Sequence, residues 1–182
     1  MSATPDFRTF SLWAPVAETI DLHLDGQVLP MNRGERGWWA RSAPAEVGSR
    51  YGFAVDGGQV VPDPRAGRLP DGPHGLAEII DLRDAAWTDQ DWGGIELPGS
   101  VIYELHIGTF TPQGTLDAAI GHLDQLVELG IDVIELMPVN AFPGRHGWGY
   151  DGVGLWAVHE PYGGPRGLQA FVDAAHARGL GV

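Results

Sequence analysis

The chain has 182 residues, of which 43% are hydrophobic and 19% charged, as expected for a globular protein of one or two domains. Eleven basic residues against 24 acidic ones give a net charge of −13. This charge disfavours nucleic acids and anionic membranes as partners, because phosphate contacts need a basic surface. The absence of cysteine excludes disulfides and thiolate metal sites within these residues.

The N-terminal sequence shows no targeting signal. MSATPDFRTF lacks the basic start and the apolar stretch of a signal peptide. No apolar run reaches the roughly 18 residues that a membrane-spanning helix needs. We therefore expect a cytoplasmic protein without a membrane partner.

Short alternating or aromatic runs occupy the first 82 residues. FSLW, IDLHL, WWA and YGFAV are separated by turn signals such as Asp25-Gly26 and Gly48, at intervals of roughly ten residues. Short strands at this spacing are typical of a sandwich of two antiparallel sheets. We predict an immunoglobulin-like β-sandwich over residues 1–82.

Two features of the predicted sandwich have both a functional and a structural interpretation. Trp13, Trp38 and Trp39 present flat rings that match the CH face of a pyranose, but tryptophans in a small sandwich more often form its core. The proline-restricted segment PDPRAGRLPDGPHG (62–75) is either a functional loop or a rigid connection at a domain seam. We favour the structural interpretation of both.

Residues 83–99 form a predicted linker. Hydrophobic periodicity disappears there, and Gly, Pro and Asp accumulate. We expect Trp87 and Trp92 to pack against the two flanking domains.

From residue 100 the sequence alternates between strand and helix patterns. The apolar runs VIYELHI (101–107) and VIELM (133–137) are typical of parallel strands buried on both faces. Between them, apolar residues recur at three- and four-residue steps, which predicts one helix from an N-cap at Thr115 to a stop at Gly130.

A second helix pattern completes this region. It begins at Gly164-Pro165, ends before Gly179, and is followed by Leu180-Gly181-Val182, which opens a third strand. Because strands and helices alternate, residues 100–182 have the βαβ pattern of a parallel sheet or of a β/α barrel, and this pattern stops at the third strand. The fold class is thus multidomain, β followed by α/β.

Candidate ligand-binding residues lie where the predicted parallel strands end. His106 ends the first strand, and its alternative role is that of a hydrogen-bonded core residue. The glycine-rich loop GRHGWGYDG (144–152) follows the second strand and carries Trp148, Tyr150 and Asp151. A hydroxylated ring needs such a stacking surface with charged hydrogen-bond partners. We predict a substrate-binding role for these four residues.

Other chemistries have little support in the sequence. Glu104 and Glu135 lie on separate strands, a spacing that says nothing about their distance, so a structural role is favoured for both. There is no P-loop and no G-x-S-x-G motif. The histidines lack metal-ligand spacing, and we predict neither a metal site nor a cofactor.

Several motifs resemble those of a known glycoside hydrolase family. FSLWAPVAETIDLHL resembles the opening of the sandwich that precedes many α-amylase superfamily barrels. The WAP and YELH motifs are shared with glycogen branching and debranching enzymes. The combination of HIGTFTPQGT, AFPGRHGWGYDG and HEPYGGP is similar to the malto-oligosyltrehalose trehalohydrolases of glycoside hydrolase family 13. The likeness covers nearly the whole chain.

This resemblance implies a retaining glycosidase that cuts the α-1,4 bond next to the trehalose end of maltooligosyl trehalose and so makes trehalose from α-glucan. The resemblance also implies that residues 100–182 are the start of a (β/α)8 barrel that stops at its third strand. The family's catalytic carboxylates follow barrel strands four, five and seven, which residues 1–182 do not include. We therefore assign no catalytic residue, and we expect an N-terminal fragment that is inactive alone. Tyr150 matches the family's tyrosine that stacks on the glucose at the cleavage subsite, and Asp151 matches its hydrogen-bonding partner.

Two alternatives stay open. One is a relative of the branching enzymes, which transfers a glucan chain instead of hydrolysing it. The other is a non-catalytic glucan-binding fragment, in which the sandwich tryptophans and Tyr150 hold sugar without turnover.

Overall fold

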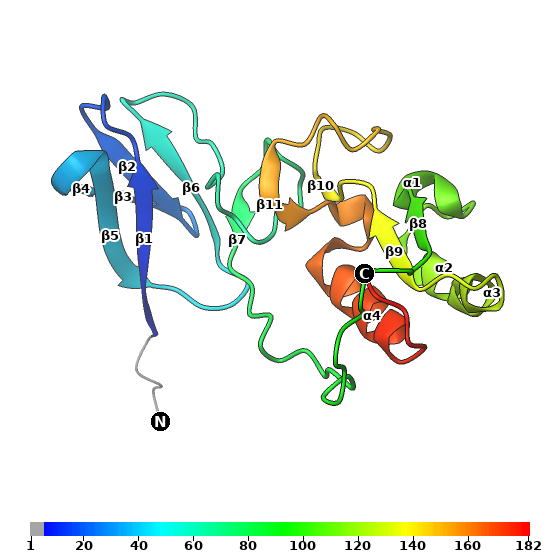
Figure 1. Ribbon diagram of the computed structural model, residues 1–182. Coiled ribbons are helices and arrows are strands. Elements are labelled where there is room, and N and C mark those ends of the chain that lie inside the picture. Colours follow the sequence, from blue (N-terminus) through cyan, green and yellow to red (C-terminus); the bar gives the residue numbers. More distant parts are fainter. Residues whose placement is uncertain (1–5) are drawn as a thin grey trace.

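The computed structural model describes residues 6–182, which form a β-sandwich and an α/β part (Figure 1). The sandwich has one sheet of order β1-β5-β4 and a second of order β3-β2-β6-β7. Its elements are β1 (Phe7–Trp13), β2 (Ile20–Leu24), β3 (Gln27–Pro30), β4 (Asn32–Arg33), the 3-10 turn η1 (Glu35–Gly37), β5 (Trp38–Pro44), β6 (Arg50–Val55) and β7 (Ala77–Glu78). The predicted sandwich fold is confirmed within the described residues, and residues 1–5 of its predicted range lie outside them. β3, β4 and β7 are short strands that the sequence patterns did not indicate.

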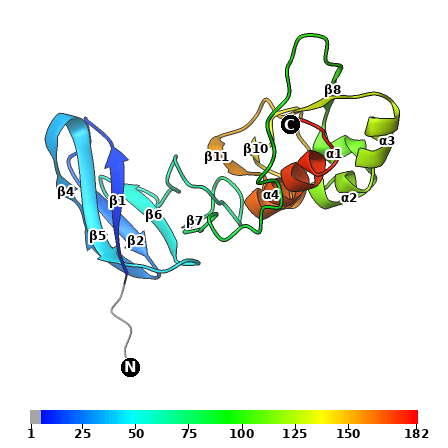
Figure 2. The same ribbon diagram turned by 60° about the horizontal axis from the view of Figure 1, so that its bottom comes forward.

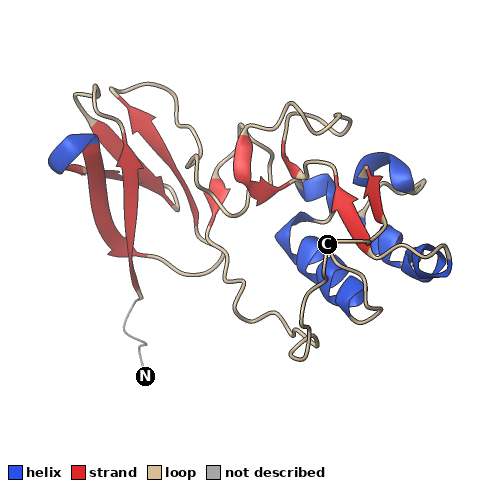
Figure 3. Ribbon diagram, in the orientation of Figure 1, coloured by secondary structure: helices blue, strands red, loops and turns tan. Residues whose placement is uncertain are grey.

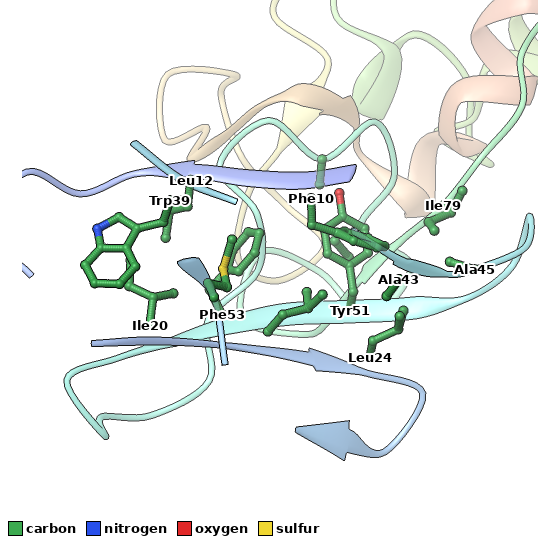
Figure 4. Close-up of a cluster of buried hydrophobic side chains, with 14 of the residues drawn as sticks. Phe10, Leu12, Ile20, Leu24, Trp39, Ala43, Ala45, Tyr51, Phe53 and Ile79 are labelled. Carbon is green, nitrogen blue, oxygen red and sulfur yellow. The ribbon is translucent and has the colours of Figure 1, made fainter. Parts of the chain in front are cut away.

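Alternating side chains from the two sheets fill the core of the sandwich (Figure 4). Phe53 and Leu22 are fully buried, and the ring of Tyr51 lies 4.9 Å from that of Phe10. Asp25 and Gly26 both have positive φ, which suits the two-residue turn between β2 and β3. The turn and the alternation together set the register that directs Leu22 inward.

The three sandwich tryptophans do not share one environment. Trp39 is 4% exposed and its indole N–H donates to the carbonyl of Ala14 at 3.0 Å, so it belongs to the core. Trp13 and Trp38 are 59% and 42% exposed and lie opposite each other on β1 and β5. The core interpretation is right for Trp39 and wrong for the other two, because successive residues of a strand point to opposite faces.

Residues 83–99 contain no helix or strand and lie against the α/β part. The ring of Trp92 stacks on that of His176 at 4.3 Å, and His176 also contacts the carboxylate of Asp89 at 2.6 Å. Thr88 hydrogen-bonds Asp173 on the same helix. These contacts attach the segment to α4 (Gly164–His176), so Trp92 packs on one of the two parts and not between them.

The α/β part contains a parallel pair of strands with helices packed beside it (Figures 2 and 3). Gly181 pairs in parallel with Val133, so the predicted third strand begins as expected. The elements are β8 (Ile102–Leu105), α1 (Ile107–Phe110), α2 (Leu116–Ile120), α3 (Leu123–Glu128), β9 (Val133–Leu136), β10 (Asn140–Ala141), β11 (Gly154–Val158), the 3-10 turn η2 (Glu160–Tyr162) and α4.

Two expectations for this part need correction. The single helix predicted between Thr115 and Gly130 is divided into α2 and α3, because Gly121 ends α2 and His122 leaves the helical region with φ −110° and ψ 0°. The N-cap is confirmed, since the Thr115 hydroxyl accepts from the Ala118 N–H. The first three residues of β8 are exposed, so this strand is not buried on both faces.

A small hairpin, β10 and β11, joins the two cores. Ala141 and Ala157 belong to the apolar cluster of the sandwich, whereas the next residues, Phe142 and Val158, belong to the cluster of the α/β part. Figure 1 shows the hairpin between the two parts. Successive strand residues point to opposite faces, so one hairpin can contribute to both cores.

Charged side chains reinforce the same junction. The Arg68 guanidinium contacts Glu78 of β7 at 2.7 Å and Glu160, which follows β11, at 2.5 Å. Asp63 is buried in the proline-rich segment and accepts a hydrogen bond from the Tyr51 hydroxyl. These contacts agree with a rigid connection at the seam. Within residues 6–182, no helix has the length and apolar character to cross a bilayer.

Candidate functional site

The carboxyl ends of β8 and β9 form the base of the candidate site. The Met137 N–H donates to the carbonyl of Leu105 at 2.9 Å, which holds the two strand ends side by side. His106 follows Leu105 directly and precedes the one-turn helix α1. Because parallel strands end at the same edge of a sheet, residues after β8 and after β9 converge there.

A cavity of about 580 Å³ lies at this edge. Its lining combines an indole ring, a phenol ring, two histidines, an arginine and a carboxylate with Met137, which is the mixture of apolar surface and polar groups expected of a ligand pocket. The residues that line it are His106, Gly108, Thr109, Met137, Arg145, His146, Gly147, Trp148, Asp151 and Tyr162.

The cavity brings together three of the four residues predicted from the sequence. His106, Trp148 and Asp151 line it, whereas Tyr150 is exposed and is not among the lining residues. Sequence reasoning did not single out Tyr162, which comes from the segment after β11. The available signal was an aromatic residue directly before Gly163-Gly164, at the start of a helix.

Glycines allow the loop over the cavity to approach its neighbours closely. A β-carbon built on Gly147 would lie 2.8 Å from the ring of Phe142, and one on Gly149, where φ is +87°, would lie 2.9 Å from the carbonyl oxygen of Pro138. Neither position has room for a side chain. The glycines thus place Trp148 close to the strand ends.

A stack of aromatic rings supports the loop from below. Phe142 is buried and stacks on His159 with 3.7 Å between ring centroids, and Tyr162 packs edge-on against both rings. His159 is 2% exposed, and neither ring nitrogen has a hydrogen-bond partner. Burial lowers the pKa of His159 below its ordinary value of 6.5, because a desolvated imidazole resists a charge.

We expect the stability of the chain to fall in acid because of His159. In the unfolded chain this imidazole takes up a proton near pH 6.5, whereas the folded chain resists protonation until lower pH. Below pH 6.5 the unfolded state therefore binds more protons, and the free energy of unfolding falls as the pH drops. Urea unfolding at pH 8 and pH 5 measures this loss.

The matched comparison is His159→Phe, which keeps a stacked ring but cannot titrate. This variant should lose less stability than the unaltered chain between pH 8 and pH 5. A control variant, His122→Phe, alters a histidine whose ring contacts Gln125 near the surface, and it should keep the original dependence. If the unaltered chain and His159→Phe lost equal stability between pH 8 and pH 5, His159 would not be the cause of the acid sensitivity.

The other titratable groups of the strands lie outside the cavity. Glu104 and Glu135 are direct register neighbours on β8 and β9, and both are exposed. Neither lines the cavity, in keeping with the structural role expected for them. Across residues 6–182, no group of three or more His, Asp or Glu side chains is placed to hold a metal ion.

The geometry of the cavity suits binding of a polar ring. The Trp148 ring is 76% exposed at the cavity and offers an apolar stacking face. Arg145, His146 and Asp151 supply hydrogen-bond donors and acceptors around it. These groups can bind and orient a hydroxylated ligand.

Two protein families match successive parts of the sequence. The carbohydrate-binding module 48 family, described as the isoamylase N-terminal domain, matches residues 2–70. The α-amylase catalytic domain family matches residues 70–182. The two matched ranges meet within the proline-rich segment and together account for nearly all of the chain.

Individual relatives agree with these matches. A malto-oligosyltrehalose trehalohydrolase from Arthrobacter ramosus is 55% identical over 96% of this chain, and one from Mycobacterium tuberculosis is 52% identical over 98%. The crystal structure of a putative α-amylase from Salmonella typhimurium is 41% identical over 99% of this chain, with a TM-score of 0.93.

The chain spans about 31% of the length of each of these relatives. The catalytic-domain match covers more than half of the 182 residues, and the solved relative shares their fold. On this evidence the chain belongs to the α-amylase family.

Proposed function

We propose that the chain serves in a malto-oligosyltrehalose trehalohydrolase, a cytoplasmic glycosidase that releases trehalose from maltooligosyl trehalose. In this role the chain supplies one wall of the substrate site, and the catalytic carboxylates lie on parts of the barrel outside residues 1–182. The observation that carries the proposal is the cavity at the ends of β8 and β9, where Trp148 and Asp151 lie beside His106.

Each predicted site residue has a chemical task in this proposal. Trp148 stacks on a glucose ring, and Asp151 accepts hydrogen bonds from sugar hydroxyls. Tyr150, which is exposed one residue before Asp151, offers a second stacking face for a glucose ring. Relatives that are more than 50% identical carry the trehalohydrolase name, which supports this substrate.

Calorimetric titration of the chain with maltooligosyl trehalose tests the binding role. We expect saturable binding and no release of trehalose by the chain alone. For the full gene product we expect free trehalose to appear. No binding by the chain and no trehalose from the full gene product would overturn the proposal.

The branching-enzyme alternative predicts a different product. A branching enzyme moves a glucan segment and creates new α-1,6 linkages, whereas a trehalohydrolase transfers the glucan to water. Incubation of the full gene product with amylose and with maltooligosyl trehalose separates the two. We expect trehalose from the second substrate and no new α-1,6 linkages from the first.

A second candidate function is glucan binding by the sandwich, and the two exposed tryptophans favour it. Trp13 and Trp38 lie side by side on the outer face of the β1-β5-β4 sheet. The Arg65 guanidinium lies over the Trp38 ring, 5.3 Å from its centroid, and donates to the hydroxyl of Ser11 at 3.0 Å. Two rings with a cation beside them suit a glucan chain.

We expect Trp38→Ala to weaken any sugar binding that belongs to the sandwich by about fivefold or more and to leave binding at the cavity unchanged. The reason is the loss of one stacking face, which contributes about 1 kcal/mol or more. Gel retardation in amylopectin measures the effect. Val28→Ala, an exposed change on the other sheet, is the control, and equal retardation of both variants would contradict a sandwich site.

A further inference from the structure

His106 is hydrogen-bonded to the loop that carries Trp148. Its Nε2 lies 2.7 Å from the carbonyl oxygen of Gly147, 41 residues further along the chain. A carbonyl oxygen can only accept, so Nε2 must carry the proton. The bond therefore joins the end of β8 to the loop, directly before Trp148.

The imidazole of His106 is held in place from its other side. With the proton on Nε2, the neutral ring has a free electron pair on Nδ1, which accepts from the Thr109 hydroxyl at 3.3 Å. The Tyr162 ring packs edge-on at 6.1 Å with an interplanar angle of 83°. The backbone at Gly108 lies so close to both rings that a β-carbon there would collide with them. Because of this close packing, the imidazole has little room to rotate.

Gly147 is in turn held between two partners. Its carbonyl meets His106, and the position of its missing side chain faces the buried ring of Phe142 at 2.8 Å. Trp148 follows at once and is largely exposed. The backbone before Trp148 is thus fixed on two sides, although the indole itself projects from the surface.

We infer that His106 is a positioning residue, which fixes Gly147 through its Nε2–H and so presents the Trp148 ring to the sugar. This inference rests on the proposed function, because it concerns the same cavity. His106 then acts on the sugar only through the loop, because its Nε2–H is hydrogen-bonded to the Gly147 carbonyl and does not reach the ligand. The tethered loop pays less conformational entropy when the sugar binds.

The test compares His106→Phe with His106→Gln. Phenylalanine keeps an aromatic ring but has no donor, and we expect binding of maltooligosyl trehalose to weaken about tenfold with the loss of one hydrogen bond. Glutamine carries an amide N–H that can reach the Gly147 carbonyl, and it should recover most of the affinity. His122→Phe, which alters a histidine that does not line the cavity, should bind like the unaltered chain.

Two further measurements separate positioning from a general structural role. Hydrogen exchange should accelerate at residues 147–150 in His106→Phe, while the urea midpoint and the exchange of buried Ile134 stay unchanged. Nitrogen NMR of the unaltered chain should find the His106 proton on Nε2. A proton on Nδ1, or unchanged exchange in His106→Phe, would overturn the inference. Failure of the unaltered chain to bind sugar would count against the proposed function instead.

Discussion

Replacing Trp148 by alanine is expected to weaken the binding of maltooligosyl trehalose by about 30-fold. A sugar stacked on one face of the ring removes about 80 Å² of apolar surface from water, which corresponds to about 2 kcal/mol. Because the ring is already exposed, its removal should change the stability of the chain by less than about 0.5 kcal/mol. The loss is therefore one of binding and not of folding.

Calorimetric titration of the variant measures this loss. The chain offers a matched control in Trp156, a similarly exposed tryptophan on β11 that does not line the cavity. Trp156→Ala should bind maltooligosyl trehalose with unchanged affinity. If the two variants lost affinity equally, the site would not lie at the ends of β8 and β9.

Replacing Phe142 by alanine should lower the free energy of unfolding by about 3 to 5 kcal/mol, the usual cost of removing a buried aromatic ring. Phe142 is buried, stacks on His159, and contacts Tyr162 edge-on at 5.8 Å. The ring also supports Gly147, so the cavity that its removal leaves lies directly under the sugar-binding loop. Sugar binding should weaken as well.

Urea unfolding followed by circular dichroism measures the change in stability. Phe7→Ala is the control, because Phe7 is an exposed phenylalanine on β1 whose removal should cost less than about 0.5 kcal/mol. A loss below about 1 kcal/mol for Phe142→Ala would mean that the aromatic stack does not support this part of the chain.

The sandwich was largely predictable because its signals are local. Alternating apolar residues such as Ile20, Leu22 and Leu24 and the turn at Asp25-Gly26 act over a few positions, and the structure keeps them. Alternation also implies that adjacent Trp38 and Trp39 face opposite sides. The same rule, applied strictly, predicts one exposed indole in that pair.

The candidate site was predictable only in part. The end of a parallel strand indicated His106, and loop composition indicated Trp148 and Asp151. The bond between His106 and Gly147 joins positions 41 residues apart, and Tyr162 enters from the segment beyond β11. No local pattern encodes such contacts, because they arise from how distant segments pack. The break at Gly121 was missed because apolar periodicity continues through it.

The hairpin that contributes to both cores bears on how such proteins can be recombined. A gene fusion whose junction lies within residues 83–99 would keep the α/β part and replace the sandwich. The replaced part includes one side of the apolar core that Ala141 and Ala157 help to fill. A foreign sandwich would meet these small side chains with the wrong shape, and misfit of this kind typically costs 1 to 3 kcal/mol. The sandwich must therefore be exchanged together with the hairpin that packs against it. A fusion junction in the linker would separate the two and lower the stability of the product.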